Sequence, residues 1–461
     1  MAIRKKAEIN MLEGPFFKKV LQFSIPLMLT SLLQTLYNAA DMLIVGLSGV
    51  DGALGAIGTT ASFCGLLLFL FIGFGSGTGV VVARNIGAGD LSATQKSVHT
   101  AVLVALISGF FTAILGELIS PAVMALLGNE GHILSLSVLY LRIYLIGAPF
   151  LALTNFFSAI LRAKGDTVTP LVVLTVSGLV NVLLNLFTVL VLHLSVDGVA
   201  IATVAANILS AAVLYVRLRK EKGAVQLQPS RLRPDREALA DIIRNGLPAG
   251  LQGMLFSVAN MLVQANITGL NNTLCPGGSD ILDGCSAAMS IENFIYVATN
   301  AVAQAAITFT SQNFGARQYR QIGRVMACCF TVSTMFALIG IAIVHGFAHQ
   351  LLGLYVSTPL AIQTGLTYII YDMGFYYIIA WMETCTFTLR GMGKPLVSTA
   401  ISLVFCCLGR VLWLYLVYPH FGTFRSIILV YPISWALAMV TALSWVLILR
   451  HRLMRQDDAA S

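Results

Sequence analysis

The stretch that decides the fold is Phe23-Ser-Ile-Pro-Leu-Met-Leu-Thr-Ser-Leu-Leu-Gln-Thr-Leu-Tyr-Asn-Ala-Ala-Asp-Met-Leu-Ile-Val45. It is long enough to cross a bilayer, which takes about 20 apolar residues in a helix, but it contains Pro26 and the carboxylate of Asp41. A charged side chain inside a membrane span costs about 2.5 kcal/mol or more, so such residues usually face an internal cavity and mark an ion or substrate path. The stretch therefore predicts a membrane helix in which Asp41 has a function.

The composition of the whole chain supports a membrane protein. Of the 461 residues, 57% are hydrophobic and 10% are charged, whereas soluble proteins carry about 25% charged residues. The net charge of +8 would suggest nucleic-acid binding in a soluble protein, but here the basic residues lie in short loops and indicate membrane orientation. We therefore expect an integral membrane protein without a nucleic-acid partner. Residues 1–14 lack the pattern of a cleavable signal peptide.

Long apolar runs predict twelve membrane spans. A lone span must satisfy its own backbone hydrogen bonds, and these runs are longer than barrel strands, so the expected fold class is all-α. The predicted spans are residues 17–47, 54–82, 94–127, 134–160, 168–192, 199–218, 240–267, 286–311, 322–346, 363–388, 395–419 and 424–449.

The basic residues predict the orientation of these spans. All but three of the 28 lysines and arginines lie on the side that both chain termini share, and the exceptions are Arg142, Arg410 and Arg425. Cytoplasmic loops carry an excess of Lys and Arg. We therefore expect a bacterial-type inner-membrane protein with both termini on the cytoplasmic side.

The longest connection on that side is residues 219–239, whose Lys, Arg, Glu and Pro content predicts a solvated cytoplasmic linker. It divides the chain into six spans plus six. We interpret these as an N-terminal lobe of residues 1–218 and a C-terminal lobe of residues 240–461.

The two lobes repeat short motifs. Arg84-Asn-Ile-Gly-Ala88 matches Gln312-Asn-Phe-Gly-Ala316, and Leu161-Arg-Ala-Lys-Gly165 matches Leu389-Arg-Gly-Met-Gly393, both 228 positions later. Pro26 matches Pro248 at 222 positions, which predicts a longer outer loop over 268–285. An even number of spans per lobe gives parallel repeats, an arrangement found in transporters with a site between the halves. Gly87 and Gly315 are expected to end helices with a positive φ.

One polar face follows the first span, because Gln34, Tyr37, Asn38 and Asp41 recur at spacings of three and four. Pro26 removes a backbone hydrogen bond about four turns away, which predicts a hinge.

Candidate partners of Asp41 lie in the fifth and sixth spans. Asn181 and Asn185 share one helical face, and Thr203 follows in the next span. These oxygens could hold a small hard cation such as Na⁺, or the desolvated carboxyl group could carry a proton. The remaining alternative is a polar network that only packs helices. The candidate cation-binding residues are Asp41, Asn181, Asn185 and Thr203.

The second lobe does not repeat the carboxylate of the first span, because Val263 takes the position of Asp41. We expect Arg410 to pair with Asp372 or Glu383, and Glu292 could simply contact water at the outer end of its span. The candidate substrate-cavity residues of both lobes are Gln34, Tyr37, Asn38, Gln252, Asn260, Gln264, Glu292, Asn300, Asp372 and Arg410.

Other motifs have narrower interpretations. Cys275 and Cys285 share the outer loop, where a disulfide is left open. The alternate glycines of the second span, Gly73, Gly75, Gly77 and Gly79, indicate close helix packing. The chain lacks a Gly-x-x-x-x-Gly-Lys-Ser/Thr loop, so we expect no ATPase motor of that type and no enzyme activity.

These features together resemble the multidrug and toxic compound extrusion (MATE) transporters over nearly the whole chain. The resemblance rests on Ile25-Pro26, Asn38-x-x-Asp41, the Asn-x-Gly-Ala loops, both Leu-Arg-x-x-Gly motifs and Tyr431-Pro-x-Ser-Trp435. Asp41 resembles the DinF-like branch. The resemblance implies twelve helices in two six-helix lobes that form a V, and export of organic, often cationic compounds in exchange for H⁺ or Na⁺.

The resemblance also implies roles for single residues. Asp41, Asn181 and Thr203 would form the cation site of the N-terminal lobe, with Pro26 at a bend. Related proteins often carry a second carboxylate where this chain has Asn185, which leaves the coupling ion open. We expect a monomer that takes small organic substrates and needs no cofactor besides the ion. The alternatives are a lipid-linked oligosaccharide flippase of the same superfamily and a membrane receptor without transport activity.

Overall fold

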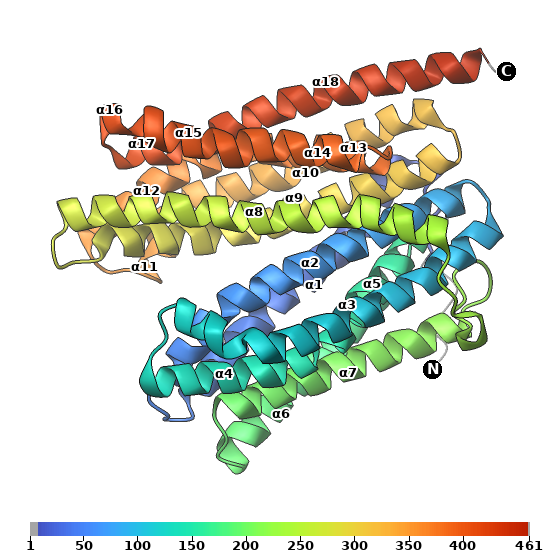
Figure 1. The fold of residues 1–461 in the computed structure, drawn as a ribbon. Helices are drawn as coiled ribbons and strands as arrows, with labels where there is room; N and C mark the ends of the chain where they lie inside the picture. The colour runs from blue at the N-terminus through green and yellow to red at the C-terminus, as the bar shows by residue number, and fades with distance from the viewer. Residues whose placement is uncertain (1–7, 460–461) are drawn as a thin grey trace. The chain divides into compact units, whose positions relative to one another are not determined.

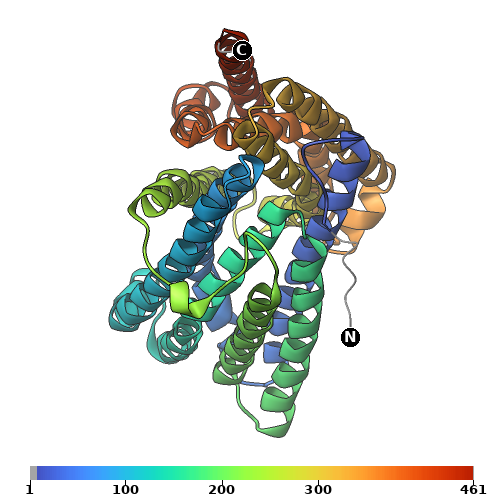
Figure 2. The ribbon, with the colours of Figure 1, turned by 90° about the vertical axis from the view of Figure 1, so that its right-hand side faces the viewer.

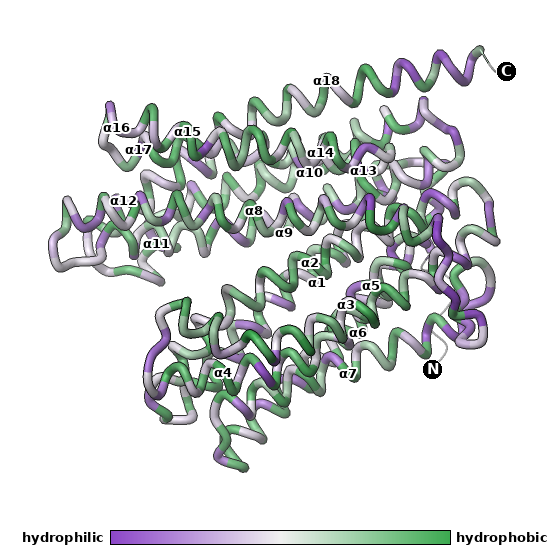
Figure 3. Tube along the Cα trace, in the orientation of Figure 1, coloured by the Kyte–Doolittle hydropathy of each residue, from purple (hydrophilic) through white to green (hydrophobic). Residues whose placement is uncertain are grey.

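The computed structural model describes residues 8–459, apart from the side chain of Ser62, and the regular secondary structure in that part is all helical (Figure 1). Figure 3 shows hydrophobic residues along most of each helix and hydrophilic residues towards many helix ends. The helices of the first half are α1 (Phe16–Gly46), α2 (Ala53–Gly87), α3 (Leu91–Leu126), α4 (Gly131–Ile146), α5 (Ala148–Lys164), α6 (Val168–Leu186), the π-helix η1 (Phe187–Val191) and α7 (Val196–Lys220).

The 3₁₀ helix η2 (Pro229–Arg231) precedes the second half. That half comprises α8 (Arg236–Leu274), α9 (Asp280–Gly315), α10 (Tyr319–Gly346), α11 (Ala348–Gly353), α12 (Pro359–Tyr371), the 3₁₀ helix η3 (Met373–Phe375), α13 (Tyr376–Gly391), α14 (Pro395–Ser402), the π-helix η4 (Leu403–Leu408), α15 (Gly409–Leu416), α16 (Tyr418–Phe421), α17 (Phe424–Ile428) and α18 (Val430–Asp458).

Helices occupy all twelve predicted spans. Within residues 8–459, nine helical stretches are long and apolar enough to cross a membrane, and α4 with α5 makes a tenth if this pair, bent by 49°, is one span. The two others are less apolar or interrupted: α9 carries Glu292, Asn293, Asn300 and Gln304 along its middle, and the α12–α13 span is broken by η3. The fourth span breaks at Gly147, between α4 and α5, and the tenth span breaks at Phe375, between η3 and α13. These two positions lie 228 residues apart, which is the offset of the repeated motifs.

The described chain divides into two compact units. Unit 1 contains residues 29–251 and the described residues up to Asn10, and unit 2 contains residues 11–28 and the described residues from Gln252 onward. These edges differ from the predicted lobes, because α1 and α8 each leave one unit for the other along their length. Pro26 and Pro248 each lie within one helical turn or so before these changes of unit, which occur at Leu29 and Gln252. The lobes of residues 1–218 and 240–461 stay a prediction.

The repeated loops share backbone conformations, though not at the expected residues. Gly165 and Gly393, 228 positions apart, both have a positive φ, of 101° and 75°. Gly87 and Gly315 do end α2 and α9, but the positive φ falls two residues later, at Gly89 and at Arg317. The expectation for Gly87 and Gly315 was therefore wrong, because each helix finishes before the chain reverses.

Alternate glycines of α2 pack against two different helices, as their spacing predicts. A Cβ at Gly73 or Gly77 would lie within 2.5 Å of the backbone of Gly250 or Gly246 on α8, so these backbones are in direct contact. Gly75 and Gly79 face Asn155 and Ala159 on α5, where a Cβ would have ordinary contacts. Small residues four apart permit this close approach of membrane helices.

The expected long outer loop over 268–285 is wrong. Helix α8 continues to Leu274 and α9 begins at Asp280, which leaves only a short connection. The Asn271 side chain closes that connection, since its amide donates to the Gly278 carbonyl (2.8 Å) and its oxygen accepts from the Ile281 N–H (3.1 Å). Cys275 and Cys285 are free thiols.

The connection between α7 and α8 is held against α3 (Figure 2). Val225 and Leu227 are buried, and the Gln228 N–H donates to Nε2 of His99 (3.1 Å). Asp235 accepts from the Ala238 N–H (3.0 Å) and pairs with Lys96 (3.2 Å). These partners hold the pKa of Asp235 below its usual value, with the hydrogen bond from Ala238 as the larger cause. The predicted solvated linker is thus anchored rather than free.

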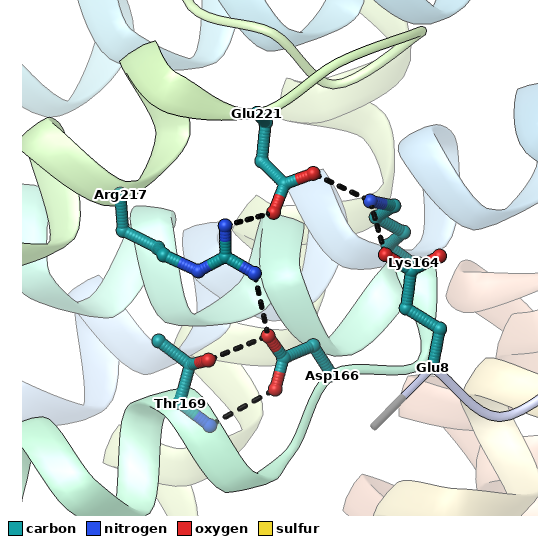
Figure 4. A network of polar contacts seen from close by, with 6 residues as sticks. All are labelled: Glu8, Lys164, Asp166, Thr169, Arg217 and Glu221. Carbon is teal, nitrogen blue, oxygen red and sulfur yellow. Dashed lines mark hydrogen bonds and ion pairs between the residues drawn. The ribbon is translucent and has the colours of Figure 1, made fainter. Parts of the chain in front are cut away.

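A network of charged residues joins α5, α7 and the segment before α1 in unit 1 (Figure 4). Lys164 pairs with Glu8 and with Glu221, each at 2.6 Å, and Arg217 pairs with Glu221 at 2.5 Å. Arg217 also approaches Asp166 (3.8 Å), whose carboxylate accepts from the N–H and hydroxyl of Thr169. Glu221 is the buried centre of this network.

Replacing Glu221 with glutamine is expected to lower the free energy of unfolding by about 1–3 kcal/mol, between the values for surface and buried pairs. The change leaves Lys164 and Arg217 facing a neutral amide. Thermal unfolding of the purified protein in detergent measures the effect. Glu237→Gln, at an exposed carboxylate on α8, is the control and should unfold like the wild type. Equal midpoints for both variants would contradict a stabilising role for the network.

Candidate functional site

Three helices of unit 1 bring together the four predicted cation-binding residues. Asn185 on α6 donates from Nδ2 to Oδ1 of Asp41 on α1 at 2.5 Å and contacts Oδ1 of Asn181 at 3.4 Å. Asn181 in turn lies 3.4 Å from the hydroxyl of Thr203 on α7. Asn181 and Asn185 are buried, and Asp41 is half-buried. We call these four residues the Asp41 cluster.

The Asp41 cluster has oxygen atoms whose acceptor positions are not all used by hydrogen bonds. Oδ1 of Asn185 is buried without a hydrogen-bond partner. The Thr203 hydroxyl donates to the Val199 carbonyl (2.9 Å) and accepts from the Asn181 amide (3.4 Å), which leaves one lone pair of its oxygen for a ligand. One carboxylate with neutral amide and hydroxyl oxygens is the donor set that hard cations prefer. The residues therefore fit a small monovalent cation. Among the described residues, no group of three or more His, Cys, Asp or Glu side chains could hold a metal ion.

The other polar residues of the first span are divided between packing and exposure. The Tyr37 hydroxyl donates to the Thr175 carbonyl (3.2 Å), and its ring lies against Gly178, where no Cβ would fit. Gln34 and Asn38 are exposed on α1. Tyr37 thus fixes α1 against α6 one turn from Asp41, whereas Gln34 and Asn38 are free to meet a ligand.

Two residues near Asp41 were missed from the sequence. Tyr140 and Tyr144 on α4 stack with ring centres 6.1 Å apart, and they pack in one hydrophobic cluster with Ile44 and Val45, which follow Asp41 by about one turn on α1. In the sequence they look like ordinary aromatic packing residues of an apolar span. Their spacing of four along one helix face was the only available signal.

Three acidic side chains lie within the spans of unit 2: Asp372 and Glu383 are buried, and Glu292 is half-buried. Glu292 on α9 accepts hydrogen bonds from the hydroxyls of Tyr368 (2.6 Å) and Tyr376 (3.0 Å), so it has protein partners besides any water at the outer end of its span. Asp372, between α12 and η3, is 0% exposed, and neither of its carboxylate oxygens has a hydrogen-bond partner. Such an unpartnered buried carboxyl group is costly and calls for a compensating interaction.

Arg410 does not form the expected ion pair with Asp372 or Glu383. Its guanidinium donates to Oδ1 of Asn260 (2.8 Å) and to the Ser434 hydroxyl (3.3 Å), and it lies 4.4 Å from the ring centre of Tyr431. The sequence placed Arg410 on the correct span, but helix rotation and the π-helix η4 before it decide which groups it meets.

Glu383 has a different set of partners. Its carboxylate accepts from the Asn300 amide (3.2 Å) and from the Tyr296 hydroxyl (3.2 Å), both on α9. Asn300, a predicted cavity residue, is therefore held by Glu383. Gln252, another such residue, is buried and accepts a hydrogen bond from Arg390. Gln264 is half-buried on α8.

Comparison with known families places the chain. The MatE family model matches residues 26–187 and 248–416, which is most of the described chain and one segment in each half. The chain belongs to the MatE family. Both matched segments begin at the repeated prolines, Pro26 and Pro248. The DinF-like branch stays a prediction, made on Asp41.

Curated relatives in this family are distant in sequence but match over most of both chains. The chain is 25% identical over 391 residues to the probable multidrug resistance protein YoeA of Bacillus subtilis (strain 168), covering 83% of this chain and 82% of YoeA. It is 24% identical over 358 residues to the multidrug export protein MepA of Staphylococcus aureus (strain N315), covering 78% of this chain and 77% of MepA.

Solved structures share the fold of this MATE protein. An outward-facing multidrug resistance MATE family transporter of the MOP superfamily superposes with a TM-score of 0.89 at 22% identity, covering 98% of this chain and all of that one. A MOP superfamily transporter from Pyrococcus furiosus gives the same TM-score and identity, covering 98% and 99%. The predicted fold class, an all-α multi-pass membrane protein with twelve helices in two six-helix lobes, is confirmed.

Proposed function

We propose that this MATE protein is an antiporter that exports small organic compounds, cationic or amphipathic, in exchange for H⁺ or Na⁺. The observation that carries the proposal is the Asp41 cluster, a carboxylate inside a membrane helix with neutral oxygens around it. A charged residue in such a position marks an ion or substrate path. The multidrug names of YoeA and MepA support organic substrates.

The proposed mechanism is alternating access. The ion and the substrate drive exchange only if they bind different conformations with different affinity. Pro26 and Pro248 lie where α1 and α8 pass between the two units, and a proline removes a backbone hydrogen bond that would stiffen the helix. We assign Pro26 as the hinge through which the state of the Asp41 cluster alters the first span.

The remaining parts of the proposal concern the membrane location, the oligomeric state and the ligands of the protein. We expect a monomer in a bacterial-type inner membrane with both termini in the cytoplasm, no enzyme activity, and no cofactor besides the coupling ion. Candidate substrate-contacting residues are the exposed Gln34 and Asn38 of α1 and the polar groups of unit 2. An oligosaccharide flippase or a receptor without transport activity is not favoured, because the named relatives are drug-resistance and export proteins.

Transport in proteoliposomes tests the proposal. Purified protein is reconstituted, a pH gradient or a Na⁺ gradient is imposed separately, and accumulation of a fluorescent organic cation is followed. Accumulation driven by one gradient, and collapsed by the matching ionophore, would support antiport and identify the ion. Equal movement of the dye with and without either gradient would contradict it.

Asn185→Asp is expected to increase the affinity of the Asp41 cluster for a cation. The change replaces an amide donor 2.5 Å from Asp41 with a second carboxylate, and two carboxylates that share a site favour a bound positive charge. Stabilisation by added Na⁺ reports this affinity through the thermal midpoint. Asn272→Asp adds the same charge at an exposed position near the end of α8 in unit 2 and should not change the Na⁺ response. An unchanged response in Asn185→Asp would argue against the assigned geometry.

A further inference from the structure

The Asp41 cluster is built by three helices that have counterparts in unit 2. Helix α1 supplies Asp41, α6 supplies Asn181 and Asn185, and α7 supplies Thr203. By the repeat, the first span corresponds to the seventh, which is α8, the fifth to the eleventh, which holds α14 and α15, and the sixth to the twelfth, which holds α17 and α18. The counterpart of the Asp41 cluster is therefore the place where α8, α15 and α18 meet.

In unit 2 these three helices meet at the guanidinium of Arg410. Arg410 lies on α15, and its guanidinium contacts Asn260 on α8 and Ser434 and Tyr431 on α18. Arg410 is 5% exposed. A positive group of the protein thus occupies the place where the first unit gathers a carboxylate and neutral oxygens.

Two acidic side chains lie within electrostatic reach of this guanidinium. The Tyr431 ring under Arg410 contacts Trp435, and Trp435 contacts Tyr376, with ring centres 5.9 Å apart in each pair. The Tyr376 hydroxyl donates to Glu292 (3.0 Å). Asp372 lies one helical turn from both Tyr368 and Tyr376, the two tyrosines that donate to Glu292. No ion pair within 4.0 Å joins Arg410 to either carboxyl group in the described part of the chain. Charges interact over longer distances in a protein interior than in water, because the effective dielectric constant is lower. The unpartnered Asp372 carboxyl group consequently has a compensating charge nearby, but no direct contact with it.

We propose that Arg410 is a built-in cation of unit 2, which compensates the charge of Glu292 and Asp372 permanently and confines binding of the coupling ion to the Asp41 cluster. The proposal rests on the proposed function, because it divides the two units of an ion-coupled transporter into one that exchanges its cation and one that does not. A covalently tethered guanidinium cannot leave the site. Without it, the buried carboxyl group of Asp372 and the half-buried one of Glu292 would be left to attract a free cation.

Chemical rescue tests this role of Arg410. Arg410→Ala is expected to lower the thermal midpoint, and millimolar guanidinium chloride, far below denaturing concentrations, should recover at least half of the loss. Choline chloride at equal ionic strength should not, because its cation is too bulky for the vacated space. The wild type and Arg410→Lys, which keep a tethered cation, should not respond to guanidinium. A wild-type response, or none in Arg410→Ala, would overturn the proposal.

The carboxyl groups provide the matched control. Adding Glu292→Gln and Asp372→Asn to Arg410→Ala should remove the guanidinium response, since nothing would be left to bind the cation. If the response persists in this triple variant, guanidinium acts elsewhere and the proposal fails.

A second measurement does not require the Arg410→Ala variant to fold. Binding of ²²Na⁺ to Asp41→Asn reports on unit 2 alone, and no saturable binding is expected while Arg410 is present. Saturable binding that disappears on adding Asp372→Asn would overturn the proposal. Removing Arg410 from the Asp41→Asn protein should create one saturable site. If transport does not depend on Asp41, the proposed function is contradicted, but the guanidinium response of Arg410→Ala remains. Failure of the proposed function can therefore be distinguished from failure of the role proposed for Arg410.

Discussion

Asp41→Asn is expected to reduce gradient-driven export to the rate of protein-free liposomes. The change removes the one carboxylate of the Asp41 cluster, and the remaining oxygens of Asn181, Asn185 and Thr203 are neutral. A neutral site has no charge with which to attract a cation, and an amide cannot carry the transferred proton. The effect should be on coupling, so dye uptake driven by either imposed gradient is the measurement.

The fold should survive this substitution. The Asn185 amide that donates to Asp41 can donate equally to the oxygen of the introduced amide, which has the same shape as the carboxylate. Thermal unfolding and gel-filtration profiles should match those of the wild type. Asp51→Asn, at an exposed position between α1 and α2, removes the same charge outside the membrane spans and should transport normally. Export by Asp41→Asn at the wild-type rate would exclude the assigned role.

The parts of this protein that were predictable from its sequence follow from periodicity and repetition. Apolar runs gave twelve spans because membrane helices need them. The alternate glycines of α2 indicated close packing, and the structure supplies the partners, Gly246 and Gly250 for one face and Asn155 and Ala159 for the other. The partners of Asp41 were predictable as a set, since Asn181, Asn185 and Thr203 were the polar residues of neighbouring spans.

The parts that failed depend on details that spacing does not contain. Arg410 was expected to meet an acidic residue, but the π-helix η4 before it changes the helix register, and its contacts are neutral. The expected outer loop became helix because one side chain, Asn271, satisfies the backbone of a short connection. Tyr140 and Tyr144 gave no signal beyond their aromatic character and their spacing of four along one face of an apolar helix. In each case the deciding contact is between residues far apart in sequence or within one unpredicted turn.

The second large effect is expected at the crossing of α2 and α8 in unit 1. Adding one methyl group with Gly77→Ala places a Cβ 2.4 Å from the backbone nitrogen of Gly246 and 2.6 Å from its Cα. Backbone atoms cannot move aside like the end of a flexible side chain, so the helices must separate. Overpacking of a well-packed interior costs about 1–3 kcal/mol and occasionally more, and a backbone clash belongs at the upper end of that range.

Gly79→Ala is the matched control for this prediction, because it adds the same methyl group to the same helix two residues later. Its Cβ would lie 3.7 Å from the Ala159 carbonyl oxygen, an ordinary contact, and alanine is favoured over glycine in a helix by about 1 kcal/mol. We therefore expect Gly79→Ala to yield a monodisperse protein with a wild-type or higher thermal midpoint. Gly77→Ala should instead give aggregated protein or a midpoint lower by several degrees. Equal stability of the two variants would show that α2 and α8 do not cross at Gly77, because only direct backbone contact distinguishes these two positions.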